Sequence, residues 1–486
     1  MLYRIAFSGI ERRIGFSHMG RIKYLIKNTF LFALGSFGSR LVVFLLVPLY
    51  TSVLLPEEYG VVDLLFTICT ILGPIITLNI SEGVMRFCLD KDSDKDKILS
   101  NTFFIILIGV AIGALTIPIS GLFEVSKGYG LLIYFCSLFI GCAQVFLYYL
   151  RGIEKPLLYS VGCIIQTLLI ALFNILFLVV FKWGVVGYFR AYICANAVTS
   201  LFCLVVGKVN IFNLIKRGVD KNLFQLMLKY SVAFIPNTFM WWIMNASDRV
   251  MVTAMIGTAA NGLYSVSYKI PGLVSVCNTI FNQAWSYSAI KESDSEDRLQ
   301  FTNKIFSWLV MFAAVTSISI LLVLKPVMRV YVSAAYYDAW KYSPILLLGN
   351  FFLILGSFVG STTYTVDKNS FGMLKSGIFG AIPNIILNAI MIPIIGIAGA
   401  AIATCISYFI VTAYRIWDTH QSFPLKWASK DNIVCVIAMI LATIMSYIPE
   451  PFSELTVGCV LLVLIVYYRK MIKAMLDRFL KRKLNS

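Results

Sequence analysis

The chain has 486 residues, of which 59% are hydrophobic and 13% are charged, and its mean hydropathy is +0.84. Soluble globular proteins carry about 25% charged residues, so this composition excludes an ordinary soluble domain and predicts a membrane protein. The formal net charge of +17 would favour a polyanionic partner in a soluble protein. Here the positions of the basic residues give a different explanation.

Apolar segments of membrane-spanning length recur along the whole chain. A helix that crosses a hydrocarbon core of ~30 Å needs about 20 mostly apolar residues. We therefore predict an all-α, polytopic membrane protein with about 14 transmembrane helices. The first segment lacks a signal-peptide cleavage pattern, so we interpret it as a retained span. The predicted spans are 28–55, 58–80, 98–118, 129–150, 156–181, 184–207, 226–256, 261–290, 304–325, 342–364, 372–393, 395–415, 432–448 and 455–468.

Lys and Arg residues are unevenly distributed between the two predicted sides of the membrane. With both termini cytoplasmic, the predicted outer loops hold Lys127, Lys182, Lys325, Arg329 and Lys341. Four further basic residues lie within spans, and all others fall in cytoplasmic loops or at the termini. This bias follows the positive-inside rule and predicts cytoplasmic ends. Nucleic-acid binding is therefore unnecessary as an explanation of the charge.

Two regions of the chain repeat the same spacing. Lys27 precedes Gly60, and Lys229 precedes Gly262, by equal lengths of mostly apolar sequence. A second pair of glycine-containing turns, at 184–187 and 396–399, closes each half. We predict two parallel six-helix lobes with a substrate site between them. The predicted units are a cytoplasmic extension or interfacial segment at 1–19, an N-lobe at 20–221, a C-lobe at 222–426, and an appended helical pair with a basic tail at 427–486.

Metal and cofactor chemistry finds little support in the sequence. The eleven Cys residues form no CxxC pair, and nearly all lie in apolar segments, where core packing explains them. Only two His residues are present, so we predict no metal site and no cofactor. Met19 offers an alternative start to Met1. No loop is long enough for a soluble catalytic domain, and no P-loop is present.

Four basic residues lie well inside predicted spans, away from the span ends, namely Arg40, Arg190, Arg249 and Lys269. A charge at mid-membrane costs ~2.5–3.5 kcal/mol on insertion scales, so these side chains should face water or a partner. We predict that they line a cationic vestibule that binds an anionic head group. Arginine binds diphosphate oxygens through a planar fork, and lysine acts as a point charge.

Polar and aromatic side chains accompany these cations. We expect some of them to line the cavity, although aromatic residues at span ends are more often interface anchors. Residues four apart in the seventh span share one helix face with Arg249. The predicted cavity residues are Asn237, Trp241, Asn245, Ser265, Tyr268 and Asn282.

Acidic residues within the spans are fewer, and Asp63 and Asp248 are the candidates. Adjacent residues on a helix do not face each other, so Asp248 should not neutralise Arg249 directly. We predict that Asp63 or Asp248 binds a coupling cation, Na⁺ or H⁺, or releases its arginine when substrate arrives. The alternative is that these charges only pair with one another and hold helices together.

Several segments resemble those of a known transporter family. They are "LPEEYGVVDLL" (55–65), "YYLRGIEK" (148–155), "MNASDRVMV" (244–252), "NGLYSVSYKIP" (261–271), "FNQAWSYSAIKE" (281–292) and "IPIIGIAGAAIAT" (392–404). Together they resemble the Wzx-type polysaccharide and O-antigen flippases of the MOP superfamily, over about residues 23 to 415. The resemblance implies a MATE-like fold, with arginines in the first and seventh spans at the positions of Arg40 and Arg249.

The resemblance also implies a function without enzymatic chemistry. Such a protein moves undecaprenyl-diphosphate-linked oligosaccharide units from the inner to the outer leaflet of the bacterial cytoplasmic membrane by alternating access. It serves O-antigen, capsule or exopolysaccharide synthesis. Membrane lipid, a polymerase and a chain-length regulator are the implied partners of a monomer. The alternatives are a cation-coupled multidrug antiporter of the same superfamily and a polytopic polymerase or glycosyltransferase.

Overall fold

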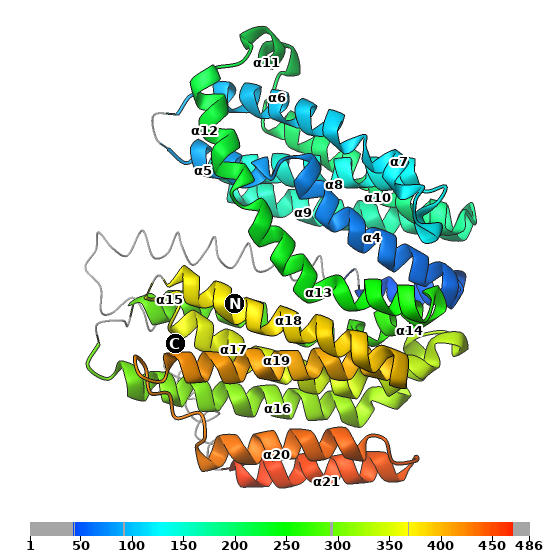
Figure 1. The fold of residues 1–486 in the computed structure, drawn as a ribbon, viewed down its shortest axis with the longest axis vertical. Coiled ribbons are helices and arrows are strands. Elements are labelled where there is room, and N and C mark those ends of the chain that lie inside the picture. Colours follow the sequence, from blue (N-terminus) through cyan, green and yellow to red (C-terminus); the bar gives the residue numbers. More distant parts are fainter. Residues whose placement is uncertain (1–41, 43, 91–92, 292–294, 368, 470–486) are drawn as a thin grey trace, which may run out of the picture.

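The structure is a computed structural model that describes residues 42, 44–90, 93–291, 295–367 and 369–469 (Figure 1). The described part of the chain consists of helices joined by short connections and contains no strand. The predicted all-α polytopic membrane fold is confirmed.

Nine helices, alone or joined to a short neighbour, are long and apolar enough to cross a membrane within the described ranges. They are α4 (Pro56–Ile76), α6 with α7 (Lys95–Gly113 and Thr116–Ser120), α8 (Gly130–Gly152), α9 with the π-helical η2 (Pro156–Asn174 and Ile175–Val180), α10 (Gly184–Val206), α16 (Arg298–Tyr331), α17 (Ser343–Thr362), α18 (Ser370–Ile395) and α19 (Ile397–Thr419). Each coincides with a predicted span.

The remaining helices are shorter or more polar. They are α3 (Val47–Val53), α5 (Ile80–Cys88), α11 (Ile211–Arg217), α12 (Lys221–Val232), α13 (Ile235–Met255), α14 (Thr258–Ser267), α15 (Lys269–Lys291), α20 (Lys430–Met445) and α21 (Phe452–Tyr467), with the 3-10 segments η1 (Glu124–Ser126) and η3 (Ala334–Lys341). Most of the predicted first span, 28–55, lies outside the described residues.

Two predicted spans are each divided into two helices. The segment 226–256 forms α12 and α13, and Pro236 lies in the first turn of α13. The segment 261–290 forms α14 and α15, and Pro271 follows the break by three residues. Proline lacks the N–H that a continuing helix needs, but it fits a first turn, so both breaks lie just before a proline.

The helices form two groups that approach each other at one end and diverge toward the other (Figure 1). One group contains α4 to α10, and the other contains α14 to α19. Helix α12 packs on α5 and α6, α13 contacts α4, α14 and α18, and α20 with α21 packs on α16. The division of the chain at residues 221 and 222 stays a prediction.

The two groups meet where α4 crosses α14, and glycines make this crossing possible. A Cβ on Gly60 would lie 1.8 Å from the carbonyl oxygen of Thr258, and one on Gly262 would lie 2.1 Å from that of Pro56. Asn261 Nδ2 donates to the Gly60 carbonyl oxygen at 2.9 Å. Small residues allow helix backbones to touch in this way. We call this crossing the α4–α14 seam.

Asp94 caps α6 and ties it to α11. Its Oδ1 accepts hydrogen bonds from the backbone N–H groups of Asp96 and Lys97, both at 3.1 Å, and Arg217 Nη1 lies 2.9 Å from Oδ2. The Lys97 N–H, with a smaller effect from Arg217, lowers the pKa of the Asp94 carboxyl. A lowered folded-state pKa stabilises the protein above the unfolded pKa, and this contribution is lost as the pH falls through the folded value.

We predict that Asp94→Ala lowers the free energy of unfolding by about 1 kcal/mol at pH 7, as loss of a helix cap does. Thermal unfolding in detergent measures this change. The difference from wild type should vanish at pH values well below about 4, where the wild-type carboxylate is protonated. Asp338→Ala, an exposed pair with Lys341, is the control. Equal losses in both variants would contradict the capping role.

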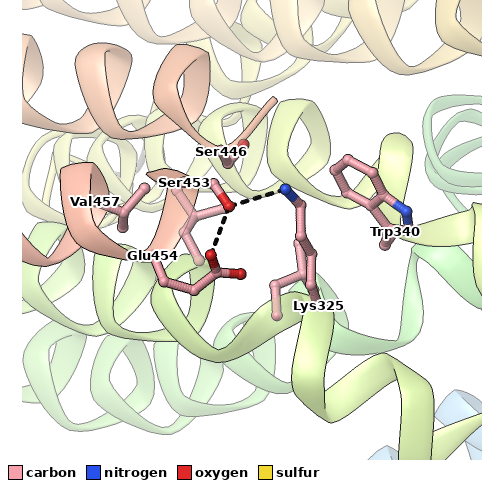
Figure 2. A pocket seen from close by; sticks show the side chains of 8 residues that line it. Lys325, Trp340, Ser446, Ser453, Glu454 and Val457 are labelled. Atoms are coloured by element: carbon pink, nitrogen blue, oxygen red, sulfur yellow. Dashed lines mark hydrogen bonds between the residues drawn. The ribbon is translucent and has the colours of Figure 1, made fainter. Parts of the chain in front are cut away.

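Lys325 lies inside α16 and not in an outer loop, which corrects the sequence prediction. The helix continues through Pro326 to Tyr331. Figure 2 shows the Lys325 ammonium between Ser453 and the Trp340 ring. Its Nζ donates to the Ile448 carbonyl oxygen at 2.9 Å and to Ser453 Oγ at 3.0 Å, and lies 4.5 Å from the Trp340 ring centroid. These contacts anchor the turn between α20 and α21 on α16.

We predict that Lys325→Met destabilises the docking of α20 and α21 by about 2 kcal/mol, because hydrogen bonds to a buried charged group are lost. The expected readout is a lower unfolding temperature in detergent and faster proteolysis between α19 and α20. Lys341→Met removes an ammonium that pairs with Asp338 at the surface and serves as the matched control. Unfolding of Lys325→Met at the control's temperature would refute this anchoring role.

Candidate functional site

A buried carboxylate lies just inside the α4–α14 seam. Asp63 of α4 is 8% exposed, and its Oδ1 accepts a hydrogen bond from Ser265 Oγ of α14 at 2.5 Å. Arg249 Nη1 of α13 lies 3.5 Å from the same oxygen, and Lys269 Nζ of α15 lies 3.9 Å from it. We call Asp63, Arg249, Ser265 and Lys269 the Asp63 cluster. It joins α4 to three helices from the second half of the chain.

Neighbouring side chains hold the two cations in place. Arg249 Nη1 donates to Thr67 Oγ1 at 3.2 Å, and the guanidinium carbon lies 5.6 Å from the Tyr268 ring centroid. Lys269 Nζ lies 5.8 Å from the Tyr59 ring centroid. Aromatic faces attract cations by their quadrupole and preserve some of the charge stabilisation that water would give.

The Asp63 cluster carries one more positive charge than negative charge. The side chains of Arg249 and Lys269 are 21% and 23% exposed, so neither is fully enclosed by the protein. Arg249 Nε has no acceptor among the described residues. A guanidinium beside an ammonium can bind a polyvalent anion such as a diphosphate.

A second polar cluster surrounds Asp248, which is 4% exposed. Its Oδ2 accepts from Tyr264 Oη at 2.6 Å, Tyr268 Oη at 3.2 Å and Thr404 Oγ1 at 3.4 Å. Its Oδ1 accepts from the backbone N–H of Arg249 at 2.9 Å. The Asp248 carboxylate therefore accepts hydrogen bonds from hydroxyls of α14, of the turn between α14 and α15, and of α19. The Arg249 guanidinium instead contacts Asp63 and Thr67.

Two amides of α18 extend this second cluster. Asn384 Nδ2 donates to Thr404 Oγ1 at 3.4 Å, and Asn388 Nδ2 donates to Asn384 Oδ1 at 3.0 Å. Asn388 Oδ1 is buried and has no donor among the described residues. We call Asp248, Tyr264, Asn384, Asn388 and Thr404 the Asp248 cluster. A carboxylate with amide and hydroxyl oxygens is the ligand type that hard cations prefer. Within the described ranges, no group of three or more His, Cys, Asp or Glu residues is placed to hold a metal ion.

The structure places Arg190 apart from the Asp63 cluster. Its side chain is exposed on α10, and its guanidinium carbon lies 4.7 Å from the Trp183 ring centroid. No hydrogen bond or ion pair joins it to the Asp63 cluster in the described part of the chain. Tyr188 and Phe189 are buried in the core, which leaves Arg190 on the exposed side of α10 with Leu201.

The other predicted cavity residues have different outcomes. Ser265 belongs to the Asp63 cluster, and Tyr268 lies beside the Asp248 cluster, where its hydroxyl donates to Asp248 Oδ2. Asn282 lies between α15 and α17, where its Nδ2 donates to Asn278 Oδ1 at 2.6 Å and its Oδ1 accepts from Ser361 Oγ at 3.3 Å. Arg40 and the side chains of Asn237, Trp241 and Asn245 lie outside the described residues.

Several residues in or beside the two clusters were not predicted from the sequence. They are Tyr59, Thr67, Tyr264, Asn384, Asn388 and Thr404. Asn384 and Asn388 lie one helical turn apart in an otherwise apolar span. Paired amides on one face of a membrane helix are a signal of a polar site, and this signal was available. Thr67 lies one turn after Asp63, so the helical period also places it on the same face.

The chain is similar to a known protein family and to a membrane protein of an archaeon. Residues 25–290 match the model of a family described as polysaccharide biosynthesis protein. An uncharacterized membrane protein of Methanocaldococcus jannaschii is 31% identical over 159 residues. That match covers 31% of this chain and 29% of the relative, so it spans less than a third of the relative's length.

Two solved structures share the fold. The lipid II flippase MurJ in an inward closed conformation is similar to this chain, with a TM-score of 0.66 and 16% identity. The match covers 92% of this chain and 100% of the MurJ chain. An inward-facing multidrug resistance MATE family transporter of the MOP superfamily is similar with a TM-score of 0.66 and 15% identity, and covers 79% of this chain and 94% of its own.

Proposed function

The chain belongs to the polysaccharide biosynthesis protein family, and on this premise we propose that it is a flippase for diphosphate-linked saccharide lipids. The predicted resemblance to the MOP-superfamily flippases and the predicted MATE-like fold are confirmed by the family match and the two shared folds. Both solved neighbours are named as a flippase or a transporter, which agrees with the prediction that the chain is not an enzyme.

The observation that carries the proposal is the Asp63 cluster. Two cations from the second half of the chain face one carboxylate of the first half. A diphosphate offers more charge and more acceptor oxygens than one carboxylate, so it competes well for Arg249 and Lys269. The proposed substrate is an undecaprenyl-diphosphate-linked oligosaccharide, whose tail stays in lipid while the sugars pass between the two helix groups.

The proposed direction is from the inner to the outer leaflet of the cytoplasmic membrane. It follows from the predicted cytoplasmic termini, because α4 and α14 then begin at the outer side and the groups diverge toward the inner side (Figure 1). A head group would enter from the inner side, bind the cations, and leave when the α4–α14 seam opens. Surface-polysaccharide synthesis is the proposed pathway, with its polymerase and chain-length regulator as partners of a monomeric flippase.

We place cation coupling at the Asp248 cluster. Its carboxylate, amides and hydroxyls come from α13, α14, α18 and α19. A bound Na⁺ would draw these helices together, whereas a bound H⁺ would remove the charge of the Asp248 carboxylate. The unsatisfied Asn388 Oδ1 gives this site a free acceptor. A coupling ion bound there lies one residue from Arg249, so its binding is linked to the substrate site through the α13 backbone.

We predict that Asp248→Asn lowers the acceleration of transport by an ion gradient about tenfold, because the charged ligand is lost. Vesicles with a Na⁺ gradient and vesicles with a pH gradient identify the ion. Asp338→Asn, an exposed carboxylate, is the matched control. If Asp248→Asn responds to both gradients as wild type does, coupling does not depend on this cluster.

The experiment that tests the proposed function is a translocation assay in reconstituted vesicles. The probe is a fluorescent prenyl-diphosphate disaccharide, and a membrane-impermeant quencher reports the leaflet it occupies. We expect protein-dependent translocation of this probe, and much slower translocation of the corresponding prenyl alcohol. Transport of a cationic dye without the diphosphate lipid would favour a multidrug antiporter. Extension or transfer of the sugar would favour a polymerase or glycosyltransferase.

A further inference from the structure

The two helices of the α4–α14 seam present matching positions to each other. Asp63 follows Gly60 by the same number of residues as Ser265 follows Gly262. Four residues further on, Thr67 still lies in α4, whereas Lys269 is the first residue of α15. The two close contacts of the crossing are equivalent. Each glycine lies against the carbonyl four residues before the other glycine, Gly60 against Thr258 and Gly262 against Pro56. The seam is thus quasi-symmetric in its backbone and asymmetric in charge, because only α4 carries an acid.

Polar bonds across this seam converge on one turn of α4. Ser265, Arg249 and Lys269 all approach Asp63 Oδ1. Trp242 Nε1 of α13 donates to the Thr67 carbonyl oxygen at 2.9 Å, and Arg249 donates to the Thr67 hydroxyl. The cations proposed to bind a substrate are therefore the same groups that hold α4 against α13 and α15.

Asp63 depends on these cations to remain buried as a carboxylate. Its Oδ2 is buried and has no hydrogen-bond partner among the described residues. A buried carboxylate without a partner is strongly destabilised relative to water. If an anion withdrew Arg249 and Lys269, Asp63 would keep only the Ser265 hydroxyl, and hydration of the carboxylate would favour separation of the helices.

We propose that Asp63 is a substrate-released latch that holds the α4–α14 seam closed until a diphosphate binds Arg249 and Lys269. This inference rests on the proposed function. It adds a mechanism by which a head group that enters from the inner side causes the α4–α14 seam at the outer side to open. The diphosphate replaces the carboxylate on the two cations, the freed Asp63 draws water into the seam, and the helix groups separate there.

The test measures the distance across the predicted outer side by electron-electron double resonance. Spin labels are placed at Lys127→Cys and Asp338→Cys, two exposed positions on opposite groups, after replacement of the 11 native cysteines. Farnesyl diphosphate is the probe and farnesol is its uncharged control. In the protein with wild-type Asp63, we expect farnesyl diphosphate, but not farnesol, to increase the fraction of molecules with the longer distance between the labels. Asp63→Asn should show the increased population without any probe, with a ratio of open to closed forms at least about tenfold higher.

Two further variants keep the test decisive. Ser265→Ala retains the Asp63 charge and should give an intermediate shift, and it replaces Asp63→Asn if that variant fails to fold. Asp90→Asn removes an exposed carboxylate paired with Arg86 and should leave the distances unchanged. The latch is overturned if Asp63→Asn and Ser265→Ala keep the closed distances, or if farnesyl diphosphate binds without opening the seam. Neither result would affect the proposed function, whereas absence of farnesyl diphosphate binding would remove both.

Discussion

Arg249→Ala lowers translocation of a prenyl-diphosphate saccharide by at least about 100-fold, the expected loss when a charge-assisted, two-pronged contact to phosphate disappears. The Arg249 guanidinium lies between Asp63, Thr67 and the Tyr268 ring. Lys269→Ala should cost less, about tenfold, because an ammonium contributes a point charge without the planar fork.

The quenching assay in vesicles checks this series. Arg249→Lys keeps the charge and should restore part of the rate. Arg86→Ala, which removes an exposed arginine paired with Asp90 on α5, is the matched control and should transport as wild type does. Size-exclusion chromatography shows whether each variant is folded. A folded Arg249→Ala protein with a wild-type rate would exclude this arginine from substrate binding.

Gly60→Ala and Gly262→Ala should each lower the transport rate by more than about tenfold. The added Cβ would lie 1.8 Å or 2.1 Å from a carbonyl oxygen of the partner backbone, and a backbone cannot rotate away as a side chain can. Overpacking of this kind costs about 1–3 kcal/mol in the closed seam. The variants avoid this cost when the seam is open. These variants should therefore populate the open seam without substrate.

Gly272→Ala is the matched control, since a Cβ there meets nothing within 4 Å. It is also a helical glycine in the same region of the chain, and it should keep the wild-type rate and distances. Transport rates and the spin-label distances described above measure both expectations. Unchanged transport in Gly60→Ala and Gly262→Ala would mean that the close crossing is not required for the transport cycle.

The sequence predicted the helices well because membrane spans are local features. Twenty apolar residues between charged loops specify a span whatever their partners are. The breaks before α13 and α15 also have local causes in Pro236 and Pro271. Lys325 was misplaced because a charged residue near a proline resembles a loop, whereas the oxygens that accept its hydrogen bonds come from Ile448 and Ser453, far along the chain.

The candidate site was only partly predictable because its contacts are long-range. The sequence indicated that Asp63, Arg249 and Lys269 matter, since charges in spans need partners. The bond between Ser265 and Asp63 joins residues 202 positions apart, and no local pattern specifies it. Arg190 shows the reverse case: its depth in a span was visible, but the direction of its side chain depends on how Tyr188 and Phe189 pack.

The most direct measurement is an experimental structure of the protein in lipid with a prenyl diphosphate bound. Our account predicts phosphate density within hydrogen-bonding distance of Arg249 and Lys269, with Asp63 no longer paired to either cation. Density at another site, with Arg249 and Lys269 still on Asp63, would contradict it.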